Sequence, residues 1–382
     1  MKIAFLTTDS REHFHDYSNP NPYFGTAPQA LLAGFEDFPE IEVHVVSCVQ
    51  SPVRSPATIG RNIYYHSLLV PKLGWLRSGY LGCRRAVLKL LDRLQPDLVH
   101  GQGTERDCAL SAVFSGRPSI LTVHGNMRRI ARLNHARPFS FAWITARLEG
   151  VALRRAAGVV CITQHTKREV ENLARRVWVV SNAVDPAFFS VKRNPVSPPL
   201  LVCVATISAL KNQQRLIAAV DSLIREQPIR LLFLGLADGS DYSKQFQQIL
   251  SSRPWCEHRG FVKPPELRQI LGSVSGLVLP SLEENCPMVI LEAIAAGTPV
   301  LASSVGGIPE LIDSSSGWLF DPLAESDIAG RIREFLSSSA RANAMAEFAR
   351  EKGKERFHPK MVAARHLEIY REMLNGSRSA AS

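Results

Sequence analysis

Short apolar runs that alternate with helical segments occur in both halves of this 382-residue chain, and they restrict its fold more than any other feature. The runs of the first half are four to six residues long and rich in Val, Ile and Leu. Such runs suit strands of a parallel sheet that is buried on both faces. We predict strands over residues 2–8, 42–47, 97–101, 119–124, 158–162 and 177–180, with helices over 29–35, 81–94, 139–156 and 166–173. The alternation predicts an α/β domain with a doubly wound parallel sheet.

A proline-rich break separates the two halves. Residues 186–199 contain four prolines and little apolar periodicity, which indicates a linker. The pattern then restarts, with strands predicted over 200–205, 229–235, 256–262 and 276–280 and helices over 212–225, 242–250 and 265–271. We therefore expect an N-terminal domain over 1–185, a C-terminal domain over 200–357 and a separate last helix over 358–376.

The segment 280–310 carries the clearest chemical signal, and it reads PSLEENCPMVILEAIAAGTPVLASSVGGIPE. Glu284 follows a predicted strand, and Pro287 falls where the first turn of a helix would begin. Glu292 lies about two turns into that helix, which Gly297 ends. A helix N-terminus between two carboxylates can bind an anionic diphosphate, while the carboxylates accept hydrogen bonds from hydroxyl groups. This chemistry suits a sugar nucleotide.

The Glu-x7-Glu spacing and the following GGIPE at 306–310 resemble retaining glycosyltransferases of family 4. The resemblance implies a GT-B fold, in which two Rossmann-like domains face a ligand-binding cleft and the last helix crosses back to the N-terminal domain. It also implies metal-independent hexosyl transfer from a UDP- or GDP-linked donor to a carbohydrate or lipid-linked glycan, as in polysaccharide or lipopolysaccharide biosynthesis. The nucleotide sugar is a co-substrate, and no cofactor is expected. A degenerate sugar-nucleotide-binding scaffold and a sugar-nucleotide epimerase on the same fold stay open as alternatives.

The resemblance assigns roles to individual residues of the donor site. Glu284 would hold hydroxyls of the transferred sugar, Glu292 would bind the ribose hydroxyls, and Lys211 would grip the diphosphate. Thr206 stands where the family has an arginine, so it can donate a hydrogen bond but adds no charge. Pro287 offers no N–H. Further donor contacts are expected from Gly25, Asn285, Cys286, Met288, Val289, Phe261 and Val262.

His124 ends a predicted strand and is followed by glycine, so it should project from the sheet edge. By resemblance it hydrogen-bonds the donor sugar and joins Glu284 and Lys211 as a catalytic residue. His100 also ends a predicted strand, and a role in packing or in the wall of the cleft is favoured for it. Four other residues are assigned to the acceptor, namely His13, Tyr17, Arg128 and Arg129. The His-x-His-Asp pattern around His13 is interpreted as a polar loop, and no metal site is predicted.

The charge of the chain is uneven. The formal net charge is +10, of which +8 falls in residues 1–185. This predicts an anionic partner for the first half, such as a membrane leaflet or an anionic glycan, and the basic stretch 72–93 is the candidate membrane contact. No nucleic acid is expected as a partner. The start of the chain lacks signal-peptide features, and the seven cysteines are scattered, so we expect a cytoplasmic protein, with the inner face of the membrane as a further location.

Overall fold

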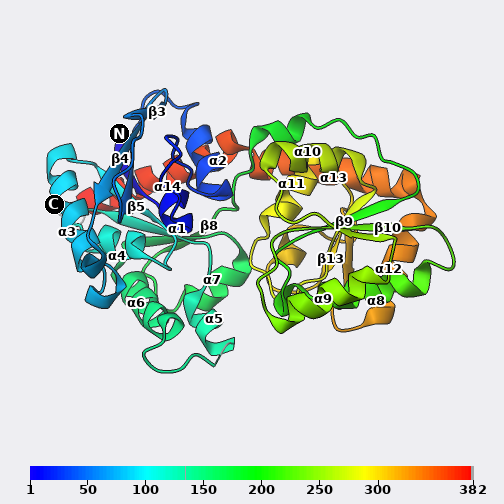
Figure 1. Ribbon diagram of the computed structural model, residues 1–382. Helices are drawn as coiled ribbons and strands as arrows, with labels where there is room; N and C mark the ends of the chain where they lie inside the picture. The colour runs from blue at the N-terminus through cyan, green and yellow to red at the C-terminus, as the bar shows by residue number, and fades with distance from the viewer. Residues whose placement is uncertain (134, 380–382) are drawn as a thin grey trace. The chain divides into compact units, whose positions relative to one another are not determined.

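Two separate, mostly parallel sheets form the framework of the chain (Figure 1). The computed structural model describes residues 1–133 and 135–379. Its contacts divide the chain into two units, one made of Met1–Asp185 with the segment from His358 onward, the other of Pro186–Phe357. The predicted α/β fold is confirmed.

The sheet of the first unit has the strand order β3-β4-β2-β1-β5-β6-β7-β8. Only β3 runs antiparallel to its neighbour among these strands. The strands are β1 Lys2–Leu6, β2 Glu42–Val49, β3 Thr58–Gly60, β4 Ile63–Leu69, β5 Leu98–Gln102, β6 Ser119–Val123, β7 Gly158–Cys161 and β8 Val177–Val179. The α-helices are α1 Ser10–Phe14, α2 Thr26–Phe35, α3 Leu81–Leu94, α4 Asp107–Val113, α5 Met127–Leu133, α6 Phe141–Arg155, α7 Gln164–Val170 and α14 Pro359–Ser379.

Strand β1 shows why this sheet needs helices on both faces. Successive strand side chains point to opposite faces, and all but the first residue of β1 are buried. Ile3 and Phe5 pack with the side chains of α2 and α14. Ala4 and Leu6 pack with those of α3, α4 and α6. The continuous apolar runs thus fill two separate cores, one on each side of the sheet.

The sheet of the second unit is parallel throughout, in the order β11-β10-β9-β12-β13-β14. Its strands are β9 Leu200–Val204, β10 Arg230–Leu234, β11 Cys256–His258, β12 Gly276–Leu279, β13 Val300–Ser303 and β14 Trp318–Phe320. Its α-helices are α8 Gln213–Leu223, α9 Asp241–Ser251, α10 Pro264–Ser273, α11 Met288–Ala296, α12 Glu325–Ser337 and α13 Ser339–Phe357. Helices α8, α9, α12 and α13 pack their apolar residues on one face of this sheet.

The last helix, α14, belongs to the first unit although it follows the second in sequence. It packs beside α2, and Val362, Leu367, Tyr370 and Met373 lie in the core that these two helices share with the sheet. The predicted return of the C-terminal helix to the N-terminal domain is therefore confirmed.

The predicted linker 186–199 packs on the second unit. The backbone N–H of Asn194 donates to Gly272 and that of Val196 to Ser273. The Arg193 guanidinium donates to the carbonyl oxygen of Leu271 over 2.6 Å. Prolines interrupt the apolar periodicity here, but these hydrogen bonds hold the segment in place.

Several elements escaped the sequence analysis. Strand β4 reads IYYHSLL, and its mixture of buried and exposed positions differs from the continuous apolar runs on which the strand predictions were based. Helices α4 and α5 are only seven residues long, too short for a clear periodic pattern.

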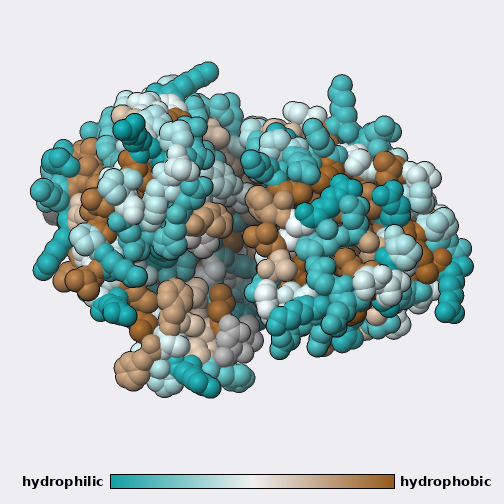
Figure 2. Space-filling view, viewed as in Figure 1, coloured by the Kyte–Doolittle hydropathy of each residue, from teal (hydrophilic) through white to brown (hydrophobic). Residues whose placement is uncertain are grey.

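The mostly hydrophilic surface and the free, mostly buried thiols match what the composition predicts. Hydrophilic side chains cover most of the visible face, and hydrophobic ones form small separate patches (Figure 2). All seven cysteines are free thiols, and six of them are buried. Within residues 1–133 and 135–379, no helix is long and apolar enough to cross a bilayer.

Candidate active site

Glu284 and Lys211 form an ion pair at the carboxyl-terminal edge of the second sheet. Glu284 lies in the loop after β12, and Lys211 precedes α8. The Lys211 Nζ atom lies 2.5 Å from Glu284 Oε1, and both side chains are largely buried, at 23% and 11% exposed. The Ser281 hydroxyl donates to the same carboxylate oxygen over 2.8 Å. Two of the three predicted catalytic residues are thus in direct contact.

Two glycines shape the backbone around this pair. Gly306 has a φ of 55°, and a Cβ atom placed on it would lie 1.8 Å from the carbonyl oxygen of Glu284. Gly235, after β10, has a φ of 139°, and its Cβ would lie 2.1 Å from the Ala205 carbonyl oxygen. A side chain at either position would displace the loops that carry Glu284 and Thr206.

Helix α11 begins one residue later than the sequence analysis placed it. Pro287 is the N-cap, with a φ of −65°, and Met288 is the first helical residue. The first N–H groups of a helix have no acceptor within it. The backbone amides of Met288 and Val289 therefore occupy positions that suit an anion. Pro287 lacks an N–H and contributes none.

The other predicted donor residues of the second unit differ in exposure. Glu292 is buried in α11, at 7% exposed. Cys286 is also buried, whereas Asn285 is partly buried. Thr206 is exposed just after β9, and its carbonyl oxygen accepts from the Gln213 side chain. Phe261 is 66% exposed and Val262 is partly buried.

His124 lies at the carboxyl end of β6 in the first unit, as predicted. Its Nε2 atom is 2.8 Å from Gln102 Oε1. Burial and the charge of His366 lower the pKa of His124 to about 4, and a hydrogen bond with Asn182 opposes this shift. The imidazole is therefore neutral at pH 7, and it acts as a hydrogen-bonding group rather than as a cation.

The remaining predicted residues of the first unit have mixed surroundings. Gly25 precedes α2 with a φ of 85°, a conformation that favours glycine. The Tyr17 hydroxyl donates to the buried Glu12 carboxylate over 2.9 Å. Arg129 pairs with Glu169 at 3.0 Å, so part of its charge is already neutralised. Arg128 lies in the first turn of α5, and its backbone N–H donates to Glu149 of α6. The side chain of His13 lies outside the described residues.

Glu149 was missed by the sequence analysis. It is fully buried in α6 and accepts from the backbone N–H groups of Met127 and Arg128, at 3.1 and 2.9 Å. The Thr104 hydroxyl donates to it over 2.5 Å. These bonds fix the segment that follows His124. A lone acid within a helical pattern gives no sequence signal for this role.

The segment after β1 is also better fixed than the predicted polar loop. Asp9 and Arg11 form a buried bidentate ion pair, with the shortest contact at 2.7 Å. The Tyr65 hydroxyl donates to Asp9 over 2.7 Å. Arg11 also donates to the carbonyl oxygens of Asn19 and Arg54. The buried guanidinium therefore ties the loop to the edge of the sheet.

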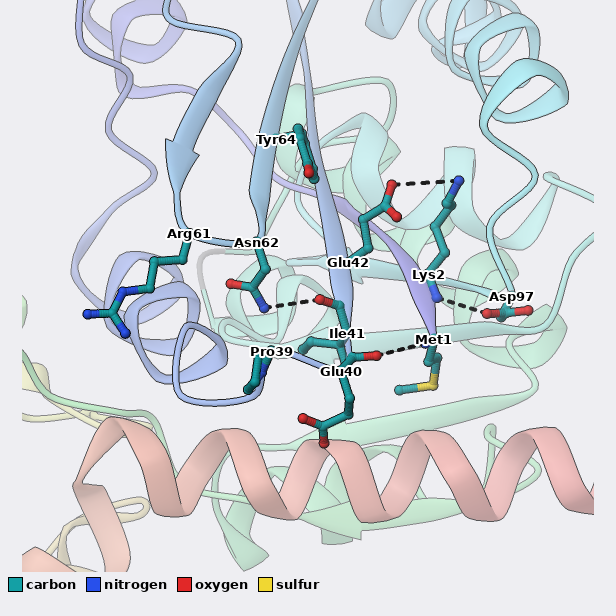
Figure 3. Close-up of a pocket in the computed structure, with 10 residues that line it drawn as sticks. All are labelled: Met1, Lys2, Pro39, Glu40, Ile41, Glu42, Arg61, Asn62, Tyr64 and Asp97. Carbon is teal, nitrogen blue, oxygen red and sulfur yellow. Dashed lines mark hydrogen bonds and ion pairs between the residues drawn. The ribbon is translucent and has the colours of Figure 1, made fainter.

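A polar pocket of about 500 Å³ lies elsewhere on the first unit (Figure 3). It is lined by Met1, Lys2, Pro39, Glu40, Ile41, Glu42, Arg61, Asn62, Tyr64 and Asp97. Lys2 and Glu42 begin their strands, so the pocket lies at the amino ends of the strands. His124 follows a carboxyl end, at the opposite edge of this sheet. Ligands of open α/β sheets bind at carboxyl ends, so we assign no part of the donor site to this pocket.

Family comparisons agree with the geometry. Residues 38–188 match the model of Glycosyltransferase Family 4, and residues 184–352 match that of Glycosyl transferases group 1. The chain belongs to the glycosyltransferases of GT-B type.

Individual relatives are distant. An uncharacterized glycosyltransferase of Methanocaldococcus jannaschii is 24% identical over 243 residues, which are 59% of this chain and 62% of that protein. Sucrose-phosphate synthase from Thermosynechococcus elongatus has the same fold, with a TM-score of 0.76 at 16% identity over 98% of this chain and all of that chain. Anabaena HepE in complex with UDP-glucose superposes with a TM-score of 0.71 at 18% identity, over 97% of this chain and all of that chain.

Proposed function

We propose that the protein transfers a hexosyl group from a UDP- or GDP-linked donor to a carbohydrate or lipid-linked glycan, with retention of anomeric configuration. One observation carries the proposal: Lys211 and Glu284 form an ion pair at the carboxyl edge of the second sheet, and the loop that carries Glu284 leads into the first turn of α11. A cation, a carboxylate and the first amides of a helix together match a sugar diphosphate. HepE, which shares the fold, was solved with UDP-glucose.

The ion pair suggests which part of the sugar nucleotide each of the two side chains binds. The Lys211 ammonium has three N–H donors, so it can hold Glu284 and a phosphate oxygen together. Glu284 Oε1 accepts from Lys211 and Ser281, which leaves Oε2 for a hydroxyl of the sugar. Negative charge that develops on the leaving diphosphate would be stabilised by Lys211 and by the amides of Met288 and Val289. We propose that these groups act without a metal.

A panel of UDP- and GDP-sugars tests the proposal, with binding measured by calorimetry and turnover by nucleotide release, each with and without a chelator. We expect one nucleotide sugar to bind and to be turned over at a rate that the chelator leaves unchanged. Failure of every nucleotide sugar to bind would refute the proposal. Binding without turnover would favour the degenerate scaffold, for which exposed Thr206 and the N-cap Pro287 are the supporting observations. An epimerised donor would identify the epimerase.

Replacement of the sugar-binding carboxylate tests the assignment within the same assay. We expect Glu284→Gln to lower kcat/KM by on the order of 10- to 100-fold, because a charge-assisted hydrogen bond becomes a neutral one. Glu283→Gln, at the neighbouring carboxylate, is the matched control and should leave turnover near wild type. Wild-type turnover by Glu284→Gln would show that the assigned sugar contact is wrong.

A peripheral contact with an anionic membrane is proposed for the basic stretch 72–93. Lys72, Arg85 and Lys89 are exposed, and Leu73, next to Lys72 in sequence, is 80% exposed. Trp75 and Tyr80, in contrast, lie in the core, so the aromatic part of the stretch serves packing. We expect Arg85→Glu with Lys89→Glu to weaken binding to vesicles that contain anionic lipid, measured by sedimentation. Equal binding of variant and wild type would contradict the contact.

A further inference from the structure

Two thiols and a carboxylate from three different elements meet inside the first unit. Cys48 lies near the carboxyl end of β2, Cys83 lies in the first turn of α3, and Asp107 is the first residue of α4. The two Sγ atoms and a carboxylate oxygen of Asp107 all lie within 4.8 Å of one another. The three residues are buried, with exposed fractions of 5%, 0% and 6%.

The Asp107 carboxylate lacks the partners that a buried charge normally has. Buried carboxylates are usually paired with a cation, bonded by strong donors or coordinated to a metal. Among the described residues, hydrogen bonds to this carboxylate come from its own backbone N–H and from the Cys48 thiol, a weak donor. The guanidinium of the adjacent Arg106 lies 3.9 Å from Glu12 and over the ring of Trp75. A cation beside Asp107 would supply the missing partner.

The donor set of two sulfurs and one oxygen matches zinc among the common divalent cations. Mg²⁺ and Ca²⁺ bind oxygen ligands, whereas Zn²⁺ accepts thiolate sulfur and carboxylate oxygen together. With Zn–S bonds of about 2.3 Å and tetrahedral angles, two sulfur ligands stand roughly 3.8 Å apart. Ligand atoms that lie within 4.8 Å of one another therefore need to close in by only about 1 Å.

The charges around the cluster suit such an ion. Zn²⁺ held by two thiolates and one carboxylate carries a single net negative charge, and its fourth position stays open for water. The positive amino end of α3, where Cys83 lies, favours a negative group. The positive charge of Arg106 also acts on Asp107. Both charges offset that of the zinc complex.

We propose that Cys48, Cys83 and Asp107 bind one Zn²⁺ ion, which ties β2, α3 and α4 together. The site belongs to the first unit, whereas the Lys211–Glu284 pair belongs to the second. The inference therefore does not depend on the proposed function. The three ligands stand 35 and 24 positions apart in the sequence, unlike the short ligand spacings of zinc motifs, so no sequence pattern marks them.

A small cluster of protonated groups in the core is the alternative. Burial raises the pKa of Asp107, and the hydrogen bond with Cys83 together with burial raises that of Cys48. Without a cation these groups would hold their protons and remain neutral. The metal content of the protein separates the two states, because the neutral cluster binds no ion.

Metal analysis and zinc X-ray absorption of the tag-free wild-type chain test the proposal without any substitution. The chain is produced in zinc-supplemented medium and purified in the presence of a reductant. We expect about one zinc per chain, with two sulfur neighbours and at least one oxygen neighbour. Protein that neither contains zinc nor takes up added Zn²⁺ would overturn the proposal. Zinc bound by nitrogen and oxygen alone, or a Cys48–Cys83 disulfide, would also overturn it.

Variants locate the ion, with Co²⁺ as the probe, because thiolate ligands give bound Co²⁺ an intense charge-transfer absorption. Cys48→Ser with Cys83→Ser should abolish this absorption. Asp107→Asn should weaken Co²⁺ binding by at least on the order of 10-fold. Cys161→Ser is the control, since Cys161 is a buried thiol of β7 outside the cluster, and it should keep the wild-type spectrum. A wild-type spectrum in the folded double variant, or unchanged affinity in Asp107→Asn, would refute the assigned ligands.

Stability and turnover separate this inference from the proposed function. Zn²⁺ that binds only the folded chain raises Tm, so prolonged dialysis against a strong chelator should lower Tm in wild type but not in the double variant. An equal change in both would place the ion elsewhere and refute the site. The buried ion should leave slowly, and zinc content measured after the nucleotide-sugar assay shows whether the chelator removed it. If no nucleotide sugar binds, the proposed function fails, while X-ray absorption still decides the zinc site.

Discussion

At the scale of single residues, the pairing of Lys211 with Glu284 is the main feature of the proposed donor site. The contact is short and largely shielded from solvent, and it joins residues 73 positions apart in sequence. Exposed ion pairs contribute little to stability, but a shielded one orients both groups. In the proposed function, the pair would therefore orient the carboxylate for a sugar and the ammonium for a diphosphate before either binds.

Removal of the cation should weaken donor binding. Lys211→Ala deletes the only positive side chain in contact with Glu284 among the described residues, so repulsion between this carboxylate and the diphosphate is no longer offset. We expect the donor Kd, measured by calorimetry, to rise by roughly 10- to 100-fold, as for the loss of a charge-assisted hydrogen bond. Lys244→Ala breaks an exposed lysine pair and should leave the donor Kd unchanged. Equal Kd values for Lys211→Ala and wild type would remove Lys211 from the site.

At the scale of elements, backbone hydrogen bonds join the loops after β12 and β13 around Glu284. The Gly307 N–H donates to the Glu284 carbonyl oxygen over 3.2 Å. The Leu282 N–H donates to Leu210 over 2.8 Å, next to Lys211. Three loops, two after strands and one before α8, are therefore connected through their backbones.

Alanine at Gly306 should disrupt this connection. The new Cβ would meet the Glu284 carbonyl oxygen at 1.8 Å, and the φ of 55° adds strain for any side chain. We expect Gly306→Ala to lower the free energy of unfolding by more than 1 kcal/mol and to weaken donor binding, measured by urea titration and calorimetry. Gly330→Ala is the matched control, because Gly330 lies in α12 with no atom within 4 Å of its added Cβ. It should gain up to about 1 kcal/mol from helix propensity. Equal stability of the two variants would contradict this account of the loop.

At the scale of the whole molecule, the return of α14 to the first unit brings the buried His366 into that unit. Burial lowers the pKa of His366 to about 4, as it does that of His124. A histidine with a depressed folded-state pKa binds its proton more readily when unfolded. Its contribution to stability is therefore fully present above pH 6.5 and is lost as the pH falls from 6.5 to about 4.

Acid should consequently destabilise the first unit. Each of these lowered histidine pKa values corresponds to a loss of roughly 3 kcal/mol in the free energy of unfolding once the pH has fallen below the folded-state pKa. We expect His366→Leu to lose less stability than wild type between pH 7 and pH 4.5, in urea titrations followed by signals of the first unit. His15→Gln, at an exposed histidine, is the control and should follow wild type. An equal loss in His366→Leu and wild type would contradict the burial argument.

The return of the last helix followed from the family resemblance, whereas the sequence by itself determined the two α/β halves and the strand-loop-helix that carries Glu284. It could do so because these features depend on local signals: continuous apolar runs, prolines and glycines at element ends, and the spacing of two glutamates. The same signals failed for β4, whose half-exposed pattern resembles an ordinary polar segment.

Only the tertiary structure decided which polar residues meet. The Lys211–Glu284 contact, the bonds of Glu149 to the segment after His124, and the contact of Tyr370 with His100 each join residues that are distant in sequence. Tyr370 and His100 are 270 positions apart, and no local pattern marks either one. A hydrogen bond needs its two partners within about 3 Å, so these contacts were fixed by the way the elements of each unit pack.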